Sequence, residues 1–217
     1  MTGFWKDAAE FLPILFQGCV ITIWVTLGSL VISTVLGLVW ALARVMGGPV
    51  LSFSSKLLVN TIRGIPIIVQ LFYIYFVLPD LGVALTAFEA AIIGLGIAYS
   101  AYQAENFRAG IEAIDPGQVE AAESIGMSRA MLMRRVVLPQ AVRIVLPPYG
   151  NTMIMMLKDS SLASTITVAE LARQGQLIAS STFKNMTVFT LVALLYLAMS
   201  VPLTMLAGWL ERKYGSK

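Results

Sequence analysis

The residue types most often used in catalysis and metal binding are scarce in this chain. It has no histidine, which removes both a common general base and a common metal ligand. Its one cysteine, Cys19, lies in an apolar run, where we expect a packed thiol rather than a disulfide. It also has no G-x-x-x-x-G-K-[ST] loop for nucleotide phosphates. We therefore expect no catalytic residues, no metal site and no cofactor bound by this chain, which on its own is not expected to be an enzyme.

Polar side chains that could contact a solute occur inside otherwise apolar stretches. They are Asn60, Gln70, Tyr73, Tyr99, Tyr102, Gln103, Glu105, Asn106 and Asn151, followed by Lys158 and Asp159. Each could instead serve only a hydrogen bond between helices. Glu105 is also spaced to pair with Arg108 on one helix face, and Lys158 with Asp159 could be a structural ion pair. As a set, however, these residues favour a polar passage through an apolar protein.

The elements that position these residues are predicted to be membrane-spanning helices. Of the 217 residues, 58% are hydrophobic and only 12% are charged, and the mean hydropathy is +0.81. Residues 11–43 and 185–210 carry no charge, and each stretch exceeds the ~20 residues that cross a bilayer. We predict an all-α integral membrane protein, with one transmembrane domain over residues 1–217. Five spans are expected, at about 18–43, 57–79, 86–110, 136–158 and 187–210. Proline is expected to break the second span at Pro66 and the fourth at Pro139 and Pro147–Pro148.

Basic residues predict the orientation of these spans, because lysine and arginine accumulate on the cytoplasmic side. One side of the membrane has the larger group of basic residues. It consists of Arg44, Lys56, Arg63, Arg108, Arg129, Arg134, Arg135, Arg143, Arg212, Lys213 and Lys217. The other side has only Lys6, Lys158, Arg173 and Lys184. The pattern places the N-terminus outside and the C-terminus in the cytoplasm.

The segment between the third and fourth spans carries a strong local signal for a short helix. Asp115 is a good N-cap, Pro116 suits the first helical position, and Gln118 could complete a capping box. Gly126 could end the helix in a left-handed conformation. Ser128 could then begin a second short helix, with Met127 and Leu132 as a hydrophobic staple. We expect Ala121 and Ala122 on the surface. The two short helices therefore form either a docking knob for another protein or a plain amphipathic connector.

Residues in this segment resemble the EAA loop of bacterial ABC importer permeases. The matching residues are Glu120-Ala-Ala122, Gly126 and Val136-Val-Leu-Pro139, with Val136 in place of the usual isoleucine. Wider similarity to the polar amino-acid subfamily, of the histidine/glutamine permease type, covers residues 18–210. It is carried by Arg63-Gly-Ile-Pro-Ile-Ile-Val-Gln70, Tyr102-Gln-Ala-Glu-Asn-Phe-Arg-Ala-Gly-Ile111, Leu138-Pro-Gln-Ala141, Leu146-Pro-Pro148 and Leu157-Lys-Asp-Ser-Ser-Leu162. Ala109 stands where the subfamily often has glycine.

The resemblance implies a subunit of an ATP-driven importer in the bacterial inner membrane. The family's partners are a second permease subunit, two cytoplasmic ATPase subunits that bind ATP-Mg, and an extracytoplasmic solute-binding protein. The EAA loop, at about 115–139, couples permease to ATPase. The coupling residues carried over are Gln118, Glu120, Ala121, Ala122, Ser124 and Gly126.

An amino-acid solute is a zwitterion, so its passage needs groups for both a carboxylate and an ammonium. The candidates are Gln70, Tyr73, Tyr99, Gln103, Glu105, Asn151, Lys158 and Asp159. A secondary transporter, a channel-like subunit and a membrane-embedded enzyme remain rival hypotheses. The sequence leaves open which amino acid or derivative is carried, whether the second permease is a copy or a homologue, and which helices line the passage.

Overall fold

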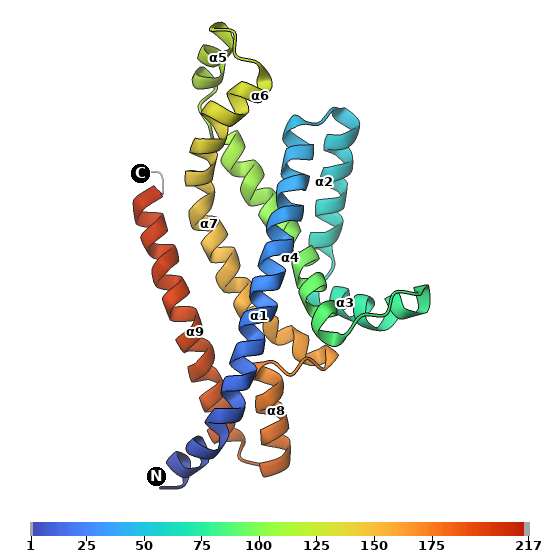
Figure 1. The fold of residues 1–217 in the computed structure, drawn as a ribbon, viewed down its shortest axis with the longest axis vertical. Coiled ribbons are helices and arrows are strands. Elements are labelled where there is room, and N and C mark those ends of the chain that lie inside the picture. Colours follow the sequence, from blue (N-terminus) through green and yellow to red (C-terminus); the bar gives the residue numbers. More distant parts are fainter. Residues whose placement is uncertain (1, 215–217) are drawn as a thin grey trace.

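The computed structural model describes residues 2–214, and Lys217 of the basic group above lies outside them. Within this range the chain is helical and contains no strand, as predicted. Its longest element, α1 (Thr2–Met46), runs most of the height of the molecule, from the N-terminus to the opposite end (Figure 1). The C-terminal helix α9 (Asn185–Tyr214) returns towards that opposite end. These two helices are the ones long and apolar enough to cross a membrane unaided.

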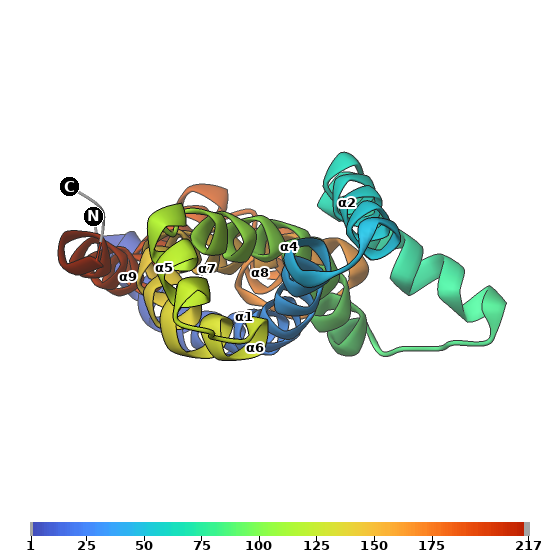
Figure 2. The ribbon, with the colours of Figure 1, turned by 90° about the horizontal axis from the view of Figure 1, so that it is seen from above.

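The predicted break of the second expected span at Pro66 is confirmed. The structure has α2 (Pro49–Gly64) before the break and α3 (Ile67–Phe72) after it, and the segment Ile67–Leu81 is bent by 97° from α2. Pro66 lies at the bend, as its missing N–H predicts. A π turn (Tyr73–Val77) and a 3-10 turn (Leu78–Leu81) extend α3 into an arm that projects sideways from the bundle (Figure 2).

The third and fourth expected spans correspond to α4 (Ala87–Glu112) and α7 (Leu138–Asp159). The prediction that prolines interrupt the fourth span is wrong. Pro139 lies in the first turn of α7, directly after a π turn (Met133–Val137), and α7 continues through Pro147 and Pro148. Membrane helices tolerate proline where neighbouring helices cover the freed backbone, and here α7 packs against α4 and α9.

Close packing of α1 on α4 forms the centre of the bundle. A Cβ added to Gly37 would come within 2.7 Å of the Gln103 Cβ, and one added to Gly96 within 2.7 Å of Ile32. Small residues of this kind let membrane helices approach closely, because lipid offers no hydrophobic force to drive them together. The α1–α4 pair is thus the frame on which the other helices are placed.

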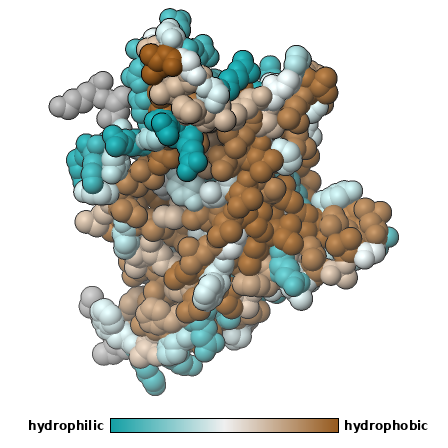
Figure 3. Space-filling view, turned by 45° about the horizontal axis from the view of Figure 1, so that its top comes forward, coloured by the Kyte–Doolittle hydropathy of each residue, from teal (hydrophilic) through white to brown (hydrophobic). Residues whose placement is uncertain are grey.

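A helix that the sequence did not predict, α8 (Leu171–Thr182), packs against α1 and α9 near the N-terminal end. A 3-10 segment (Ser160–Ile166) joins it to α7. Its N-cap is Glu170, which is fully buried. In Figure 3, hydrophobic residues cover the middle of the visible surface, and hydrophilic residues gather towards its upper and lower ends. This distribution suits a protein embedded in a bilayer.

Candidate functional site

Two short helices project beyond the bundle at the end opposite the N-terminus. They are α5 (Pro116–Ser124) and α6 (Arg129–Leu132), and we call them the coupling knob (Figure 1). The Asp115 carboxylate accepts a hydrogen bond of 2.7 Å from the Gly117 N–H and so caps α5. Gly126 follows α5 with φ +80°, as predicted for a left-handed stop. The Ser128 hydroxyl accepts a hydrogen bond from the Met131 N–H and caps α6.

The predicted coupling residues do not all lie on the surface of the knob. Gln118, Glu120, Ala121, Ser124 and Gly126 are exposed. Ala122 is only 5% exposed, which corrects the expectation that both alanines face outward. It packs in a cluster with residues from α4, α6 and α7, so its small side chain holds α5 close to the bundle. That cluster comprises Ile111, Ile114, Leu132, Val137 and Ala141.

The expected capping box at Gln118 does not form. The side chain of Gln118 instead accepts a hydrogen bond of 2.6 Å from the Gln140 amide at the start of α7. Gln140 also donates to the carbonyl of Val136. This contact ties the first turn of α5 to the first turn of α7, so the knob and the fourth span are connected directly.

The second candidate group surrounds the bend between α2 and α3. The amide of Gln70 donates hydrogen bonds of 2.9 Å to the carbonyls of Ile62 and Ile65. The Ile62 carbonyl has no donor four residues later, because residue 66 is proline, and it keeps a 3.4 Å hydrogen bond from the Ile65 N–H. The Ile65 carbonyl lies just beyond the end of α2. Gln70 therefore stabilises the break itself. Tyr73, one turn further along, is 53% exposed.

Tyr99 and Asp159 lie where α4 meets the end of α7. The Tyr99 hydroxyl donates a 2.7 Å hydrogen bond to the Asp159 carboxylate, and Tyr99 is only 1% exposed. Lys158 is exposed and, among the described residues, forms no ion pair with Asp159. The structural ion pair considered for these two residues is therefore wrong.

The remaining solute candidates occupy separate environments. Gln103 is fully buried, and its oxygen accepts a hydrogen bond from Asn106. Its amide nitrogen has no protein partner among the described residues. Asn151 is exposed on α7. Glu105 lies closer to the knob, where Arg108 pairs with it as predicted and Arg44 of α1 pairs with it as well. The eight candidates thus do not form one cluster.

Arg63 is a neighbour of this region that the sequence analysis did not select. Its guanidinium lies 5.5 Å from the centre of the Tyr102 ring, and that ring lies 5.6 Å from Tyr99. Arg63 belongs to the last turn of α2, at the bend, rather than to the end that carries the knob, where the charge count grouped it. The motif Arg63-Gly-Ile-Pro66 was the sequence signal that could have selected Arg63 as a candidate, because a cation before a helix break is well placed to meet an anion.

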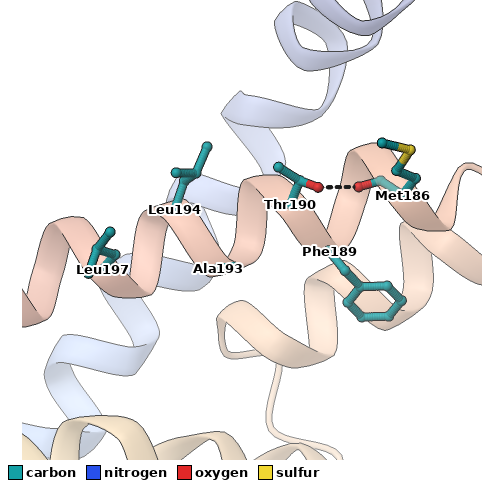
Figure 4. Close-up of a pocket in the computed structure, with 6 residues that line it drawn as sticks. All are labelled: Met186, Phe189, Thr190, Ala193, Leu194 and Leu197. Carbon is teal, nitrogen blue, oxygen red and sulfur yellow. Dashed lines mark hydrogen bonds between the residues drawn. The ribbon is translucent and has the colours of Figure 1, made fainter.

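A surface hollow on α9 offers no polar site. It has a volume of about 460 Å³ and runs along one face of α9 from Met186 to Leu197. Phe189 and Leu194 also line it, and the Thr190 hydroxyl donates to the Met186 carbonyl (Figure 4). With its one hydroxyl engaged in its own helix, this face suits lipid or an apolar protein surface rather than a zwitterion.

A family of membrane subunits matches most of the chain. Residues 33–216 match the model described as "Binding-protein-dependent transport system inner membrane component". The chain belongs to this family. The match includes the coupling knob, the bend and every solute candidate described above. This permease is also similar over nearly its whole length to curated proteins and solved structures.

Among those relatives, the permease is 43% identical over 207 residues to a probable amino-acid ABC transporter permease, PatM, of Vibrio harveyi. That alignment covers 94% of this chain and 93% of the relative. It is 37% identical to the glutamine transport system permease GlnP of Escherichia coli K12, with 96% of each chain covered. A chain in the crystal structure of an amino acid ABC transporter with histidines shares 37% identity and a TM-score of 0.90, covering 96% of this chain and 97% of that one. An inward-facing MetNI methionine transporter is 21% identical with a TM-score of 0.82, over 94% and 98% of the two chains, and supports the fold alone.

Proposed function

We propose that this chain is the permease subunit of an ATP-driven ABC importer that carries a polar amino acid or a derivative into the cytoplasm. The observation that carries the proposal is the coupling knob, a pair of capped helices anchored to the bundle through Ala122 and Gln118. Family membership and the names of the amino-acid transport relatives support the solute class.

The anchoring of the coupling knob to the bundle suits a role in transmitting force. α5 is short, is fixed at both ends by Asp115 and Gly126, and rests on an apolar cluster that includes the ends of α4 and α7. A push on α5 therefore moves α4 and α7 together. Its exposed residues would contact the ATPase, whereas Ala122 holds the helix to its own chain. ATP and Mg²⁺ would bind to the ATPase subunits.

Solute would pass near the bend, where broken helices and polar groups meet. Arg63 offers a cation for a carboxylate, and Asp159 offers an anion for an ammonium group. Both charged residues contact tyrosines of α4. The Arg63 guanidinium lies over the Tyr102 ring, and the Asp159 carboxylate accepts a hydrogen bond from the Tyr99 hydroxyl. Rocking of the bundle would expose this region to one side of the membrane and then to the other, so that solute preference alternates.

The proposed assembly contains two permease subunits, two ATPases and an extracytoplasmic solute-binding protein in a bacterial inner membrane. Apolar faces exposed on α1 and α9, which include Val31, Val35, Leu194 and Leu197, leave room for lipid and a second permease. The C-terminus and the knob are proposed to lie in the cytoplasm. The N-terminus and α8 are proposed to lie on the other side, where the binding protein docks.

The test compares two charge reversals on α5. Glu120→Lys is expected to abolish solute uptake by the reconstituted complex and to uncouple ATP hydrolysis from solute, while membrane insertion stays normal. Glu123→Lys makes the same charge change three positions later and is the control, because it lies outside the residues that the resemblance selects. Uptake at the wild-type rate by Glu120→Lys would contradict the coupling role. Uptake driven by an ion gradient without an ATPase would favour a secondary transporter.

A further inference from the structure

A run of arginines beside the knob has no acidic partner. Between Glu123 and Asp159 the chain has no aspartate or glutamate. The arginines in this interval are Arg129, Arg134, Arg135 and Arg143. All four are exposed, and within residues 2–214 none of their side chains forms an ion pair. Arg44 and Arg108, by contrast, both pair with Glu105. This segment therefore carries four exposed arginines with no acidic residue near them in the sequence.

Two of these arginines line a hollow in the surface. The hollow has a volume of about 400 Å³ and is bordered by Ala130, Met131, Arg134 and Arg135. Both arginines belong to a single wide π turn (Met133–Val137), in which the Leu138 N–H bonds to the Met133 carbonyl. The hollow is thus bordered by two arginines together with one small and one flexible apolar side chain.

An apolar groove is lined in part by residues that follow the basic hollow along the chain. Its first lining residue along α7 is Leu138, and it has a volume of about 350 Å³. Side chains of α1, α4 and α7 line it, including Phe107, Val142 and Leu146. At its far end the hydroxyls of Thr34 and Tyr149 are hydrogen-bonded to each other at 2.8 Å, so they offer little to a polar ligand.

The hollow and the groove follow one face of the same helical segment. Arg134, Leu138, Val142 and Leu146 recur at four-residue spacing, so each lies beside the next in a row that winds gradually around the helix. Arg134 and Leu138 are about one turn apart, or ~5.4 Å along a helix axis. A ligand with an anionic head and an apolar tail would match this order of surfaces.

The depth of the hollow in the molecule suits the headgroup layer of a bilayer. α9 packs against α7, and its last turns carry Trp209, Lys213 and Tyr214. Aromatic residues gather at membrane interfaces, because their rings are apolar and their edges polar. In Figure 1 the end of α9 lies beside the upper part of α7, below α6.

We propose that Arg134 and Arg135 bind the phosphate of an anionic phospholipid whose acyl chain lies in the groove between α1, α4 and α7. Guanidinium groups match phosphate oxygens with paired hydrogen bonds, and basic residues at the membrane face attract anionic headgroups. An acidic surface of a soluble partner could also meet two arginines. It would leave the adjoining groove unfilled, however, so the groove favours lipid.

The experiment measures phospholipid retained by the assembled complex after reconstitution into vesicles of phosphatidylcholine mixed with phosphatidylglycerol and extraction in mild detergent. The wild type is expected to retain phosphatidylglycerol in excess of its share of the vesicle. The double variant Arg134→Gln/Arg135→Gln is expected to lose that excess. Lys56→Gln/Arg212→Gln removes two exposed cations elsewhere and is expected to keep it. Val142→Phe, which fills the groove at a half-exposed position, is expected to lower retention without altering charge.

Four results would overturn the proposal. The first is equal retention of phosphatidylglycerol by the wild type and the double arginine variant. The second is displacement of the bound lipid by inorganic phosphate at low concentration, which would make free phosphate the ligand. The third is loss of the ATPase from the double variant with lipid retention unchanged, which would assign the arginines to that partner. The fourth is loss of permease pairing in Val142→Phe with lipid retention unchanged, which would assign the groove to a second copy.

Discussion

At the scale of single residues, Glu170 shows how a buried charge can be accommodated inside a membrane protein. Its carboxylate accepts hydrogen bonds from the Ala172 and Arg173 N–H groups at 2.9 and 2.7 Å and from the Tyr196 hydroxyl at 2.6 Å. A longer contact of 3.5 Å comes from the Thr22 hydroxyl. Glu170 therefore caps α8 and joins it to α1 and α9. Nothing in the sequence pattern identified this role, because its partners lie 148 and 26 positions away.

Replacing Glu170 is expected to destabilise the corner formed by α1, α8 and α9. Glu170→Ala leaves two N–H groups and two hydroxyls without their acceptor, at a cost of about 2–4 kcal/mol in the free energy of unfolding. Tyr196→Phe removes a single donor and is expected to cost about 1–2 kcal/mol. Glu10→Ala, at an exposed glutamate of α1, serves as the control. Thermal unfolding in detergent measures the stabilities of the three variants relative to the wild type. A Glu170→Ala variant as stable as Glu10→Ala would contradict the structural role of Glu170.

Gln70 is expected to control the shape of the bend rather than to bind solute. Gln70→Leu removes the side-chain donor to the Ile62 and Ile65 carbonyls, at a cost of about 0.5–1.5 kcal/mol for each hydrogen bond, because these carbonyls are only partly shielded from solvent. Uptake should fall through a lower maximal rate, with little change in the apparent affinity for solute. Asn60→Leu, an amide-to-leucine change at an exposed position of α2, is the matched control. A selective loss of solute affinity in Gln70→Leu would instead place this amide in the passage.

At the scale of elements, the sequence predicted where the short helices begin and end better than it predicted how the helices pack. Asp115, Gly126 and Ser128 begin and end short helices as predicted, because capping depends on neighbours within a few residues. The uninterrupted course of α7 through Pro147 was not foreseen, because it depends on the helices that cover it. The break at Pro66 was predicted, but the direction that α3 takes after it and the existence of α8 likewise depend on packing against distant segments. The predicted solute residues do not form one cluster for the same reason, because packing between distant segments decides which side chains come together.

Gly126 provides an element-scale prediction about the knob. A Cβ at this position would meet no atom within 4 Å, but φ is +80°, so alanine would strain only the backbone. Gly126→Ala is expected to destabilise the turn by about 1–2 kcal/mol and to weaken coupling between ATP hydrolysis and uptake. Gly126→Asn should retain more coupling, because asparagine tolerates the left-handed conformation.

The matched control for this prediction is Gly64→Ala. Gly64 also has open space around its Cα, and its φ is not in the left-handed range. Coupling is measured as the ratio of solute transported to ATP hydrolysed in proteoliposomes. A Gly126→Ala complex with the same ratio as the Gly64→Ala complex would contradict a strict requirement for this turn.

At the scale of the whole molecule, the orientation of the protein in the membrane can be tested, because the coupling knob and the N-terminus lie at opposite ends. The knob and the end of α9 lie towards one end, whereas the N-terminus and α8 lie towards the other (Figure 1). The mechanism proposed above requires the knob to face the cytoplasmic ATPase. It also requires the loop after α8 to face the binding protein. Charge counting along the chain gave the same orientation, although the structure places Arg63 at the bend rather than with the knob.

Single introduced cysteines distinguish the two orientations, because the native thiol Cys19 is buried and can be replaced by serine. Ser180→Cys, exposed near the end of α8, is expected to react with a membrane-impermeant maleimide in intact cells whose outer permeability barrier has been opened. Ser124→Cys, exposed on α5, should react only after the inner membrane is broken. Reaction of both sites in denaturant controls for expression. The reverse pattern would turn the knob away from the cytoplasm, and no cytoplasmic ATPase could then act through it.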